Sequence, residues 1–192
     1  MVQPDPALIR SFPTAADFGA WLAQNHAREG LLWLRLCKQG SGLPTVSKSD
    51  AIDEALCWGW IDGQLAALDA VAFLVRFTPR RPGAAWSQAN RARAEALIAA
   101  GRMQPAGLAA VQAAQADGRW QAAYPGQRAM TIPEDFLNAL ATRPEAGATY
   151  ALLNRANLYA VSYRLATART PAAREKRIAA ILDRLAKGET YH

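Results

Sequence analysis

Two neighbouring stretches decide the fold: Ile61-Asp-Gly-Gln-Leu-Ala-Ala-Leu68 and Ala72-Phe-Leu-Val-Arg-Phe-Thr78. Both have the length and the apolar content of a β-strand, and Asp69-Ala70 between them reads as the turn that joins them. A third apolar run, Leu31 to Lys38, follows Gly30. We therefore expect a small antiparallel or mixed sheet of about three strands, formed within residues 31–78.

Signals for helix starts surround this sheet. Thr14 and Asp17 have the spacing of a capping box and predict a helix over residues 15–27. Ser47 and Asp50 predict a second helix over 48–59, and both helices are expected to pack on the sheet. Strand patterns end near Thr78, and the later helices are expected at 88–101, 104–117, 133–142, 145–168 with a possible break, and 171–187.

These elements predict an α+β protein that is mainly α. Its small sheet of about three strands lies in the N-terminal half, packed with helices, and an all-helical C-terminal half follows. The loop Tyr124-Pro-Gly-Gln-Arg128 is the one plausible boundary. We expect an α+β core domain over residues 1–124 and a helical region over 129–192 that packs on it and need not fold independently.

Charge is distributed unevenly along the 192 residues, whose 51% hydrophobic content is that of a globular protein. The net charge of +6 arises from two blocks. Residues 76–102 carry six basic groups and one acidic group, and residues 164–192 carry seven and three. Such blocks attract nucleic acid, an acidic protein or a phosphorylated metabolite. The alternative is that arginine-rich helices only keep their outer faces solvated.

The cysteines and the N-terminus indicate a compartment. Cys37 and Cys57 lie in apolar surroundings and form no Cys-x-x-Cys pair, so we expect two free thiols in a reducing environment. The first ten residues lack a charged segment followed by an apolar run, and no stretch approaches about eighteen apolar residues. We therefore expect a cytoplasmic protein without a membrane span.

We expect neither a metal ion nor a cofactor. His26 and His192 are the only histidines, which leaves no material for a histidine metal site or a serine–histidine–aspartate triad. The acidic group Asp50, Asp53 and Glu54 has a simpler explanation, since acidic side chains stabilise the first turns of a helix. Gly40-x-Gly42 lacks the third glycine of a dinucleotide fingerprint and is read as a turn.

The segment around Arg80-Arg81-Pro82-Gly83 is the best candidate for a site. It places two guanidinium groups just before a helix whose first N–H groups are free to bind an anion. Large aromatic side chains nearby would wall the site. The alternative is an ordinary proline–glycine turn with solvated arginines. The candidate ligand-binding residues are Trp58, Trp60, Arg80, Arg81, Trp86, Asn90 and Arg91.

Asp62 is the one candidate for an acid or base. It follows Trp58-Gly59-Trp60 at the start of a strand and would need desolvation to raise its pKa. As a structural residue it would instead pair with Arg76 or Arg80, or cap the turn at Gly63. Cys57 is a poor nucleophile, because the acidic face of its helix raises the pKa of a thiol.

Several motifs resemble those of a known family. They are Glu54-Ala-Leu-Cys-Trp-Gly-Trp-Ile-Asp-Gly-Gln64, Arg76-Phe-Thr-Pro-Arg-Arg-Pro-Gly83, Trp86-Ser-x-x-Asn90-Arg91, Leu97-Ile-x-x-Gly-Arg-Met-x-Pro-Ala-Gly107, Tyr163-x-x-x-Thr167-Ala-Arg-Thr-Pro-x-x-Arg174-Glu-Lys-Arg-Ile178 and Leu185-Ala-Lys-Gly188. With these the chain resembles the YdeI/OmpD-associated family, also labelled bacteriocin-protection proteins. One departure is the apolar segment from Leu65 to Val75, where family members tend to carry more polar and aromatic residues.

The resemblance implies a role in tolerance of bacteriocins or related stress and brings no catalytic residue set with it. Together with the basic site, it predicts a protein that binds an anionic small molecule or an acidic partner. One alternative is an enzyme that acts on an anionic substrate, with Asp62 as acid or base and Arg80, Arg81 and Arg91 as a clamp. Another is a module that binds nucleic acid weakly and without sequence preference.

Overall fold

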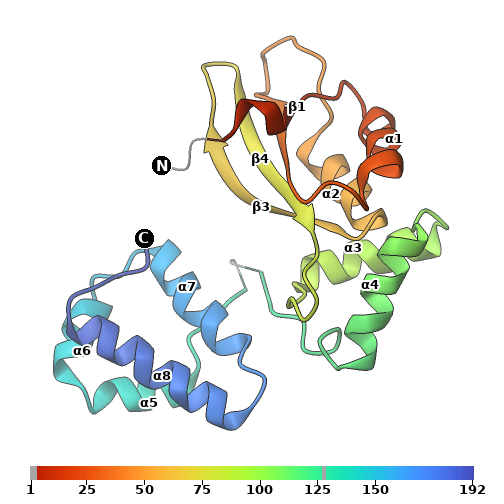
Figure 1. Ribbon diagram of the computed structural model, residues 1–192. Helices are drawn as coiled ribbons and strands as arrows, with labels where there is room; N and C mark the ends of the chain where they lie inside the picture. The colour runs from red at the N-terminus through yellow and green to blue at the C-terminus, as the bar shows by residue number, and fades with distance from the viewer. Residues whose placement is uncertain (1–3, 127–128) are drawn as a thin grey trace. The chain divides into compact units, whose positions relative to one another are not determined.

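The computed structural model describes residues 4–126 and 129–192 and divides the chain into two compact units (Figure 1). The first unit comprises residues up to Trp86 together with Asn90–Gln121. The second comprises Ser87–Ala89 and Ala122–His192. No helix among the described residues is long and apolar enough to cross a membrane. The predicted division at 124/129, with the second part packed on the first, stays a prediction.

The sheet of the first unit has four strands in the order β1-β2-β4-β3. Strands β2 (Leu32–Cys37), β3 (Trp60–Ala67) and β4 (Ala72–Pro79) are the three that the sequence predicts, and β4 pairs antiparallel with both of the others. The expected count of three strands is wrong, because β1 (Ile9–Arg10) adds a fourth, parallel to β2. Two residues are too few to show an alternating pattern, and their partner lies more than twenty residues away in the sequence.

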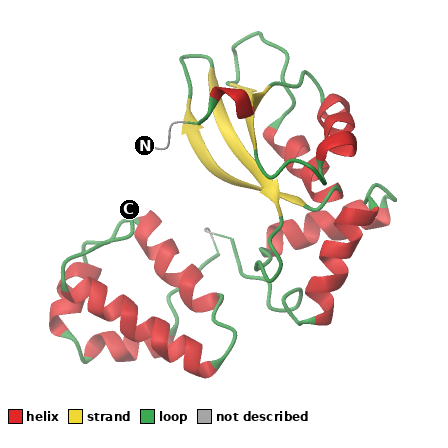
Figure 2. Cartoon of the chain, in the orientation of Figure 1, coloured by secondary structure: helices red, strands yellow, loops and turns green. Residues whose placement is uncertain are grey.

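Helices α1 (Ala15–Asn25) and α2 (Lys48–Cys57) pack on one face of this sheet, as predicted (Figure 2). Alternate residues of β2 point to that face, where they meet the buried rings of Phe18 and Phe77. The Thr14–Asp17 capping box that starts α1 is present, with the hydroxyl and the carboxylate each accepting from the other residue's N–H. The alternate apolar residues of β2, the cap at Thr14 and the cap at Ser47 therefore account for this layer.

Two further helices, α3 (Gln88–Ala99) and α4 (Pro105–Ala116), precede the loop at Tyr124 where the sequence predicts a boundary. The start of α4 meets the end of α2 at very short range. The Gln104 N–H donates to the Cys57 carbonyl at 3.0 Å, and an added Cβ on Gly107 would lie 2.3 Å from the same oxygen. Only glycine leaves room for this approach of two main chains.

Cys57 lies at this junction and is expected to resist thiol reagents in the folded protein. Burial, and after it the charge of Glu54, raises the pKa of Cys57 to about 11, so its thiolate is scarce near neutral pH. Both cysteines are free, as predicted, and Cys37 is half-buried. Labelling at pH 8, read by peptide mass spectrometry, should modify Cys37 and spare Cys57 until urea is added. Equal labelling of both in the folded protein would contradict this expectation.

The described residues of the second unit from Ala122 onward form four helices: α5 (Glu134–Ala141), α6 (Pro144–Tyr150), α7 (Arg155–Ala166) and α8 (Pro171–Ala186). The helix predicted over 145–168 does break, and Asn154 caps α7 by accepting from the Asn157 N–H at 3.0 Å. Phe136, Val161, Leu165 and Ile181 are fully buried between the helices. No main-sheet strand occurs beyond Gly101 in the described part of the chain, as predicted.

Arg174 ties three of these helices together. Its guanidinium donates to both carboxylate oxygens of Asp135 on α5, at 2.5 and 2.8 Å, and to the Leu165 carbonyl on α7 at 2.9 Å. The hydrogen bond from Arg174 lowers the pKa of Asp135 below its usual value. The pair therefore persists in mildly acidic solution and is lost only when Asp135 is protonated.

Candidate functional site

Arg80 and Trp86, two residues of the predicted site, are in direct contact. The Arg80 guanidinium carbon lies 3.7 Å from the centre of the Trp86 ring, and the group donates to the Ala85 carbonyl at 2.9 Å. Trp86 is 1% exposed and meets the ring of Trp120 edge to face at 4.8 Å. Arg80 and Trp86 are thus in contact and Trp86 is a buried core residue, while the binding site predicted around them stays a prediction.

Arg91 belongs to the same cluster through Trp120. Its guanidinium donates to the Trp120 carbonyl at 3.2 Å and lies 3.6 Å from the Glu95 carboxylate. Arg119, which the sequence did not single out, donates to the Ala84 carbonyl at 2.8 Å. Three arginines thus hold main-chain carbonyls around two tryptophans that meet edge to face. Such contacts give the side chains a structural task whether or not they also bind an anion.

The other predicted site residues lie in different surroundings. Trp60 is 1% exposed, and its indole N–H donates to the His26 carbonyl at 3.1 Å. Trp58 is half-buried, with its ring 4.7 Å from that of His26. Asn90 is half-buried in α3 and Arg81 is exposed. The contacts among the described residues do not join all of these side chains. Their convergence on one concave surface therefore stays a prediction.

Asp62 lies on β3 opposite Phe77 and is half-buried. Among the described residues its carboxylate makes no ion pair, so the expected pairing with Arg76 or Arg80 is not seen. The neighbouring acidic residues do have cationic partners. Asp53 binds Arg93 at 2.7 Å and Glu54 binds Arg102 at 2.5 Å, which gives these helix carboxylates a structural role.

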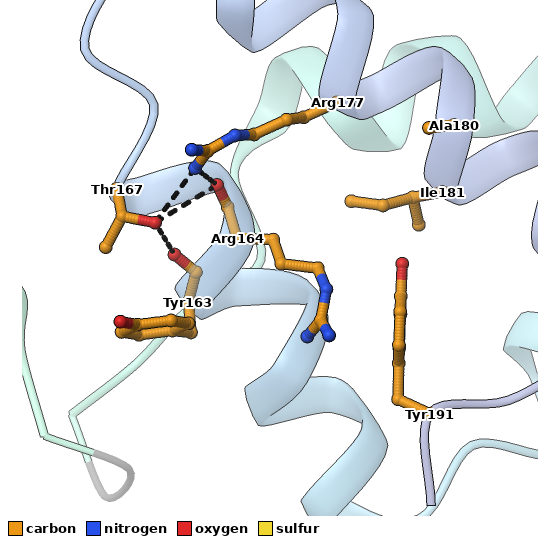
Figure 3. Close-up of a pocket in the computed structure, with 7 residues that line it drawn as sticks. All are labelled: Tyr163, Arg164, Thr167, Arg177, Ala180, Ile181 and Tyr191. Atoms are coloured by element: carbon orange, nitrogen blue, oxygen red, sulfur yellow. Dashed lines mark hydrogen bonds between the residues drawn. The ribbon is translucent and has the colours of Figure 1, made fainter.

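An open groove of about 560 Å³ lies in the second unit (Figure 3). It is built by the C-terminal part of α7, the middle of α8 and the end of the chain. The described residues that line it are two arginines, two tyrosines, one threonine and two apolar residues, and none of them carries a carboxylate. They are Tyr163, Arg164, Thr167, Arg177, Ala180, Ile181 and Tyr191.

Arg177 is held against the end of α7 by two acceptors. Its Nη1 donates to the Thr167 hydroxyl at 2.9 Å and to the Arg164 carbonyl. The Thr167 hydroxyl in turn donates to the Tyr163 carbonyl at 2.8 Å (Figure 3). These bonds occupy one nitrogen of the guanidinium and fix its plane. A side chain fixed in this way loses little entropy when its remaining N–H groups bind an anion.

Tyr191 forms the opposite wall and contacts two further arginines. The Arg164 guanidinium carbon lies 3.7 Å from the centre of its ring, and that of Arg184 lies 4.9 Å away. Arg184 also donates to the Thr190 carbonyl at 2.9 Å. Cation–π contacts of this kind hold both partners in place. Tyr191 therefore keeps the Arg164 guanidinium at the groove.

The chain end that carries Tyr191 is anchored by Asn157, which is 3% exposed on α7. The Asn157 side-chain oxygen accepts from the N–H groups of Tyr191 and His192 at 2.8 and 3.0 Å. Its amide nitrogen donates to Asn154 at 3.1 Å and to the His192 carbonyl at 3.3 Å. This buried amide is thus a positioning residue for the groove wall, because it fixes the main chain on which Tyr191 stands.

Sequence reasoning missed the groove as a site, although two signals pointed to it. The second basic block begins at Arg164, and the family motif from Tyr163 to Ile178 includes Thr167 and Arg177. The density of arginines along the chain instead favours residues 76–102. Tyr191 and Asn157 carry no local signal, since they meet only when the chain end returns to α7.

The fold and the groove define an α+β protein with a helical C-terminal unit that presents arginine and tyrosine side chains. The chain belongs to the family described as "Domain of unknown function (DUF8412)", whose model matches residues 10–110, just over half of its length. Residues 129–188 match the model described as "Bacteriocin-protection, YdeI or OmpD-Associated", which confirms the resemblance there and covers all lining residues of the groove except Tyr191. Neither a curated protein nor a solved structure matches the chain.

Proposed function

We propose that the protein binds a small anion through the groove of its C-terminal unit. The observation that carries this proposal is that two arginines, Arg164 and Arg177, line one groove whose described lining has no carboxylate. Guanidinium groups have spare N–H donors in a planar fork that suits carboxylate and phosphate. The sequence predicts a binding protein for an anionic small molecule, and we propose this groove as its binding site.

Several arginines elsewhere are already neutralised by carboxylates, which favours a small ligand over nucleic acid. Arg93, Arg102, Arg143 and Arg174 each have an acidic partner within 3.2 Å. A nucleic-acid surface needs many uncompensated cations, and its affinity falls steeply as salt rises. We therefore expect nucleic acid to bind only weakly and to dissociate as salt rises, and we propose small-anion binding as the function.

The biological setting of the proposal comes from the family description. The wording for residues 129–188 suggests a role in protection against bacteriocins. Cys37 and Cys57 are free thiols, which supports placing the protein in the reducing cytoplasm. The Trp58–Arg91 site and an enzymatic role for Asp62 stay predictions.

Titration with inorganic phosphate tests the proposal. Arg164→Gln and Arg177→Gln should each raise the Kd at least tenfold, because a charge-assisted hydrogen bond contributes roughly 1.5–3 kcal/mol. Arg155→Gln removes the same charge from the exposed first turn of α7 and should change the Kd less than twofold. Calorimetry gives the affinities, and the melting temperature of each variant shows whether it is folded. Equal affinity of all three folded variants would sink the proposal.

A further inference from the structure

The size of the groove sets a lower limit on its ligand. A volume of about 560 Å³ lies within the range of roughly 300–1,000 Å³ that accommodates metabolite- and drug-sized ligands. A single inorganic anion would leave most of such a space to water. The ligand should therefore have a body as well as a charged group.

The polar groups of the groove fix the sign of that charged group. The lining carbonyls of Tyr163 and Arg164 already accept from Thr167 and Arg177. One nitrogen of the Arg164 guanidinium donates to the Ala160 carbonyl at 3.0 Å, and its other N–H groups donate to no other atom of the described residues. The groove is thus rich in donors and poor in acceptors, which suits an anion and disfavours an amine.

The remaining lining determines the body of the ligand. Tyr191 and Ile181 form an apolar side, and Figure 3 shows the Tyr191 ring extending toward Ile181. Tyr163 is fixed from behind, since its ring meets that of Tyr124 edge to face at 4.9 Å. Planar, immobile side chains offer contact area at little entropic cost, and aromatic ligands use such area best.

We propose that the ligand is an aromatic anion, a planar ring that carries one phosphate or carboxylate group, with the charge on Arg164 and Arg177 and the ring on Tyr191 and Ile181. This inference rests on the proposed function and adds the chemical class of the ligand. Tyr191 acts as the residue that distinguishes aromatic from aliphatic anions.

Two matched pairs of probes test this class. Phenyl phosphate is compared with methyl phosphate, and benzoate with acetate, so that charge is constant within a pair and only the body changes. We expect the aromatic member to bind at least tenfold more tightly in at least one pair, and the tighter of the two aromatic probes identifies the anionic group. Equal binding within both pairs would overturn the aromatic class and leave the proposed function standing. Failure of every probe to bind would overturn both.

Variants of Tyr191 test the assignment of the ring. Tyr191→Ala should reduce the aromatic preference to less than threefold, and it should also weaken the binding of methyl phosphate, because the Tyr191 ring holds the Arg164 guanidinium. Tyr191→Phe should keep the preference, because the ring and not the hydroxyl makes the contact. Asn157 holds this segment through its main chain, so removing the ring leaves the anchor intact. An unchanged preference in Tyr191→Ala would overturn the assignment.

Discussion

Replacing Gly107 by alanine is expected to lower the free energy of unfolding by roughly 2–3 kcal/mol. The new Cβ would lie 2.3 Å from the Cys57 carbonyl oxygen and 2.7 Å from that of Leu56. Both obstacles are main-chain atoms, so no side chain can move aside to relieve them. Alanine favours a helix by only about 1 kcal/mol over glycine, which is too little to compensate.

Urea unfolding followed by tryptophan fluorescence measures this effect, because all six tryptophans lie in the first unit. Gly30→Ala is the matched control, since an added Cβ there would meet no atom within 4 Å. The control should change the free energy of unfolding by less than about 0.5 kcal/mol. A Gly107→Ala variant as stable as Gly30→Ala would show that the close approach of α2 and α4 is wrong.

The second large effect is expected from Asn157→Ala. The change deletes a buried amide that makes four hydrogen bonds, three of them to the main chain of Tyr191 and His192 and one to Asn154. We expect a loss of roughly 2–3 kcal/mol, because each bond contributes about 1 kcal/mol and the freed chain end recovers part of the loss in water. The groove should also suffer, since Tyr191 leaves Arg164.

Thermal unfolding by circular dichroism gives the stability, and titration with inorganic phosphate gives the effect on the groove. Asn138→Ala makes the same change at an exposed position of α5 and serves as the control. We expect the control to melt as the unaltered protein does, and Asn157→Ala to melt lower with weaker phosphate binding. Unaltered melting of Asn157→Ala would mean that the chain end is not held as described.

The helices were predictable from sequence because local chemistry encodes them. Thr14 and Asp17 cap α1, and Ser47 caps α2. Gly101, which has a left-handed conformation, follows the end of α3. Three strands were predictable from apolar runs of the right length. β1 was not, because a two-residue strand is defined only by its partner in space.

The candidate site was less predictable, because an arginine's task depends on what its guanidinium meets. Arg80 and Arg91 lie in an arginine-rich part of the sequence, but their guanidinium groups donate to the carbonyls of Ala85 and Trp120. Arg164 and Arg177 stand thirteen residues apart in the sequence, and the packing of α7 and α8 places both of them in the lining of one groove. Burial of Trp60 and Trp86 was equally hidden, since tryptophan serves cores and surfaces alike.

We expect anions to bind at Arg164 and Arg177. The most direct measurement is a nuclear magnetic resonance titration of the arginine side-chain Nε–H signals with phenyl phosphate. We expect saturable shifts of the Arg164 and Arg177 signals, with smaller shifts at Arg184 through Tyr191. Shifts confined to Arg80, Arg81 and Arg91, with Arg164 and Arg177 unmoved, would contradict it and return the site to the N-terminal unit.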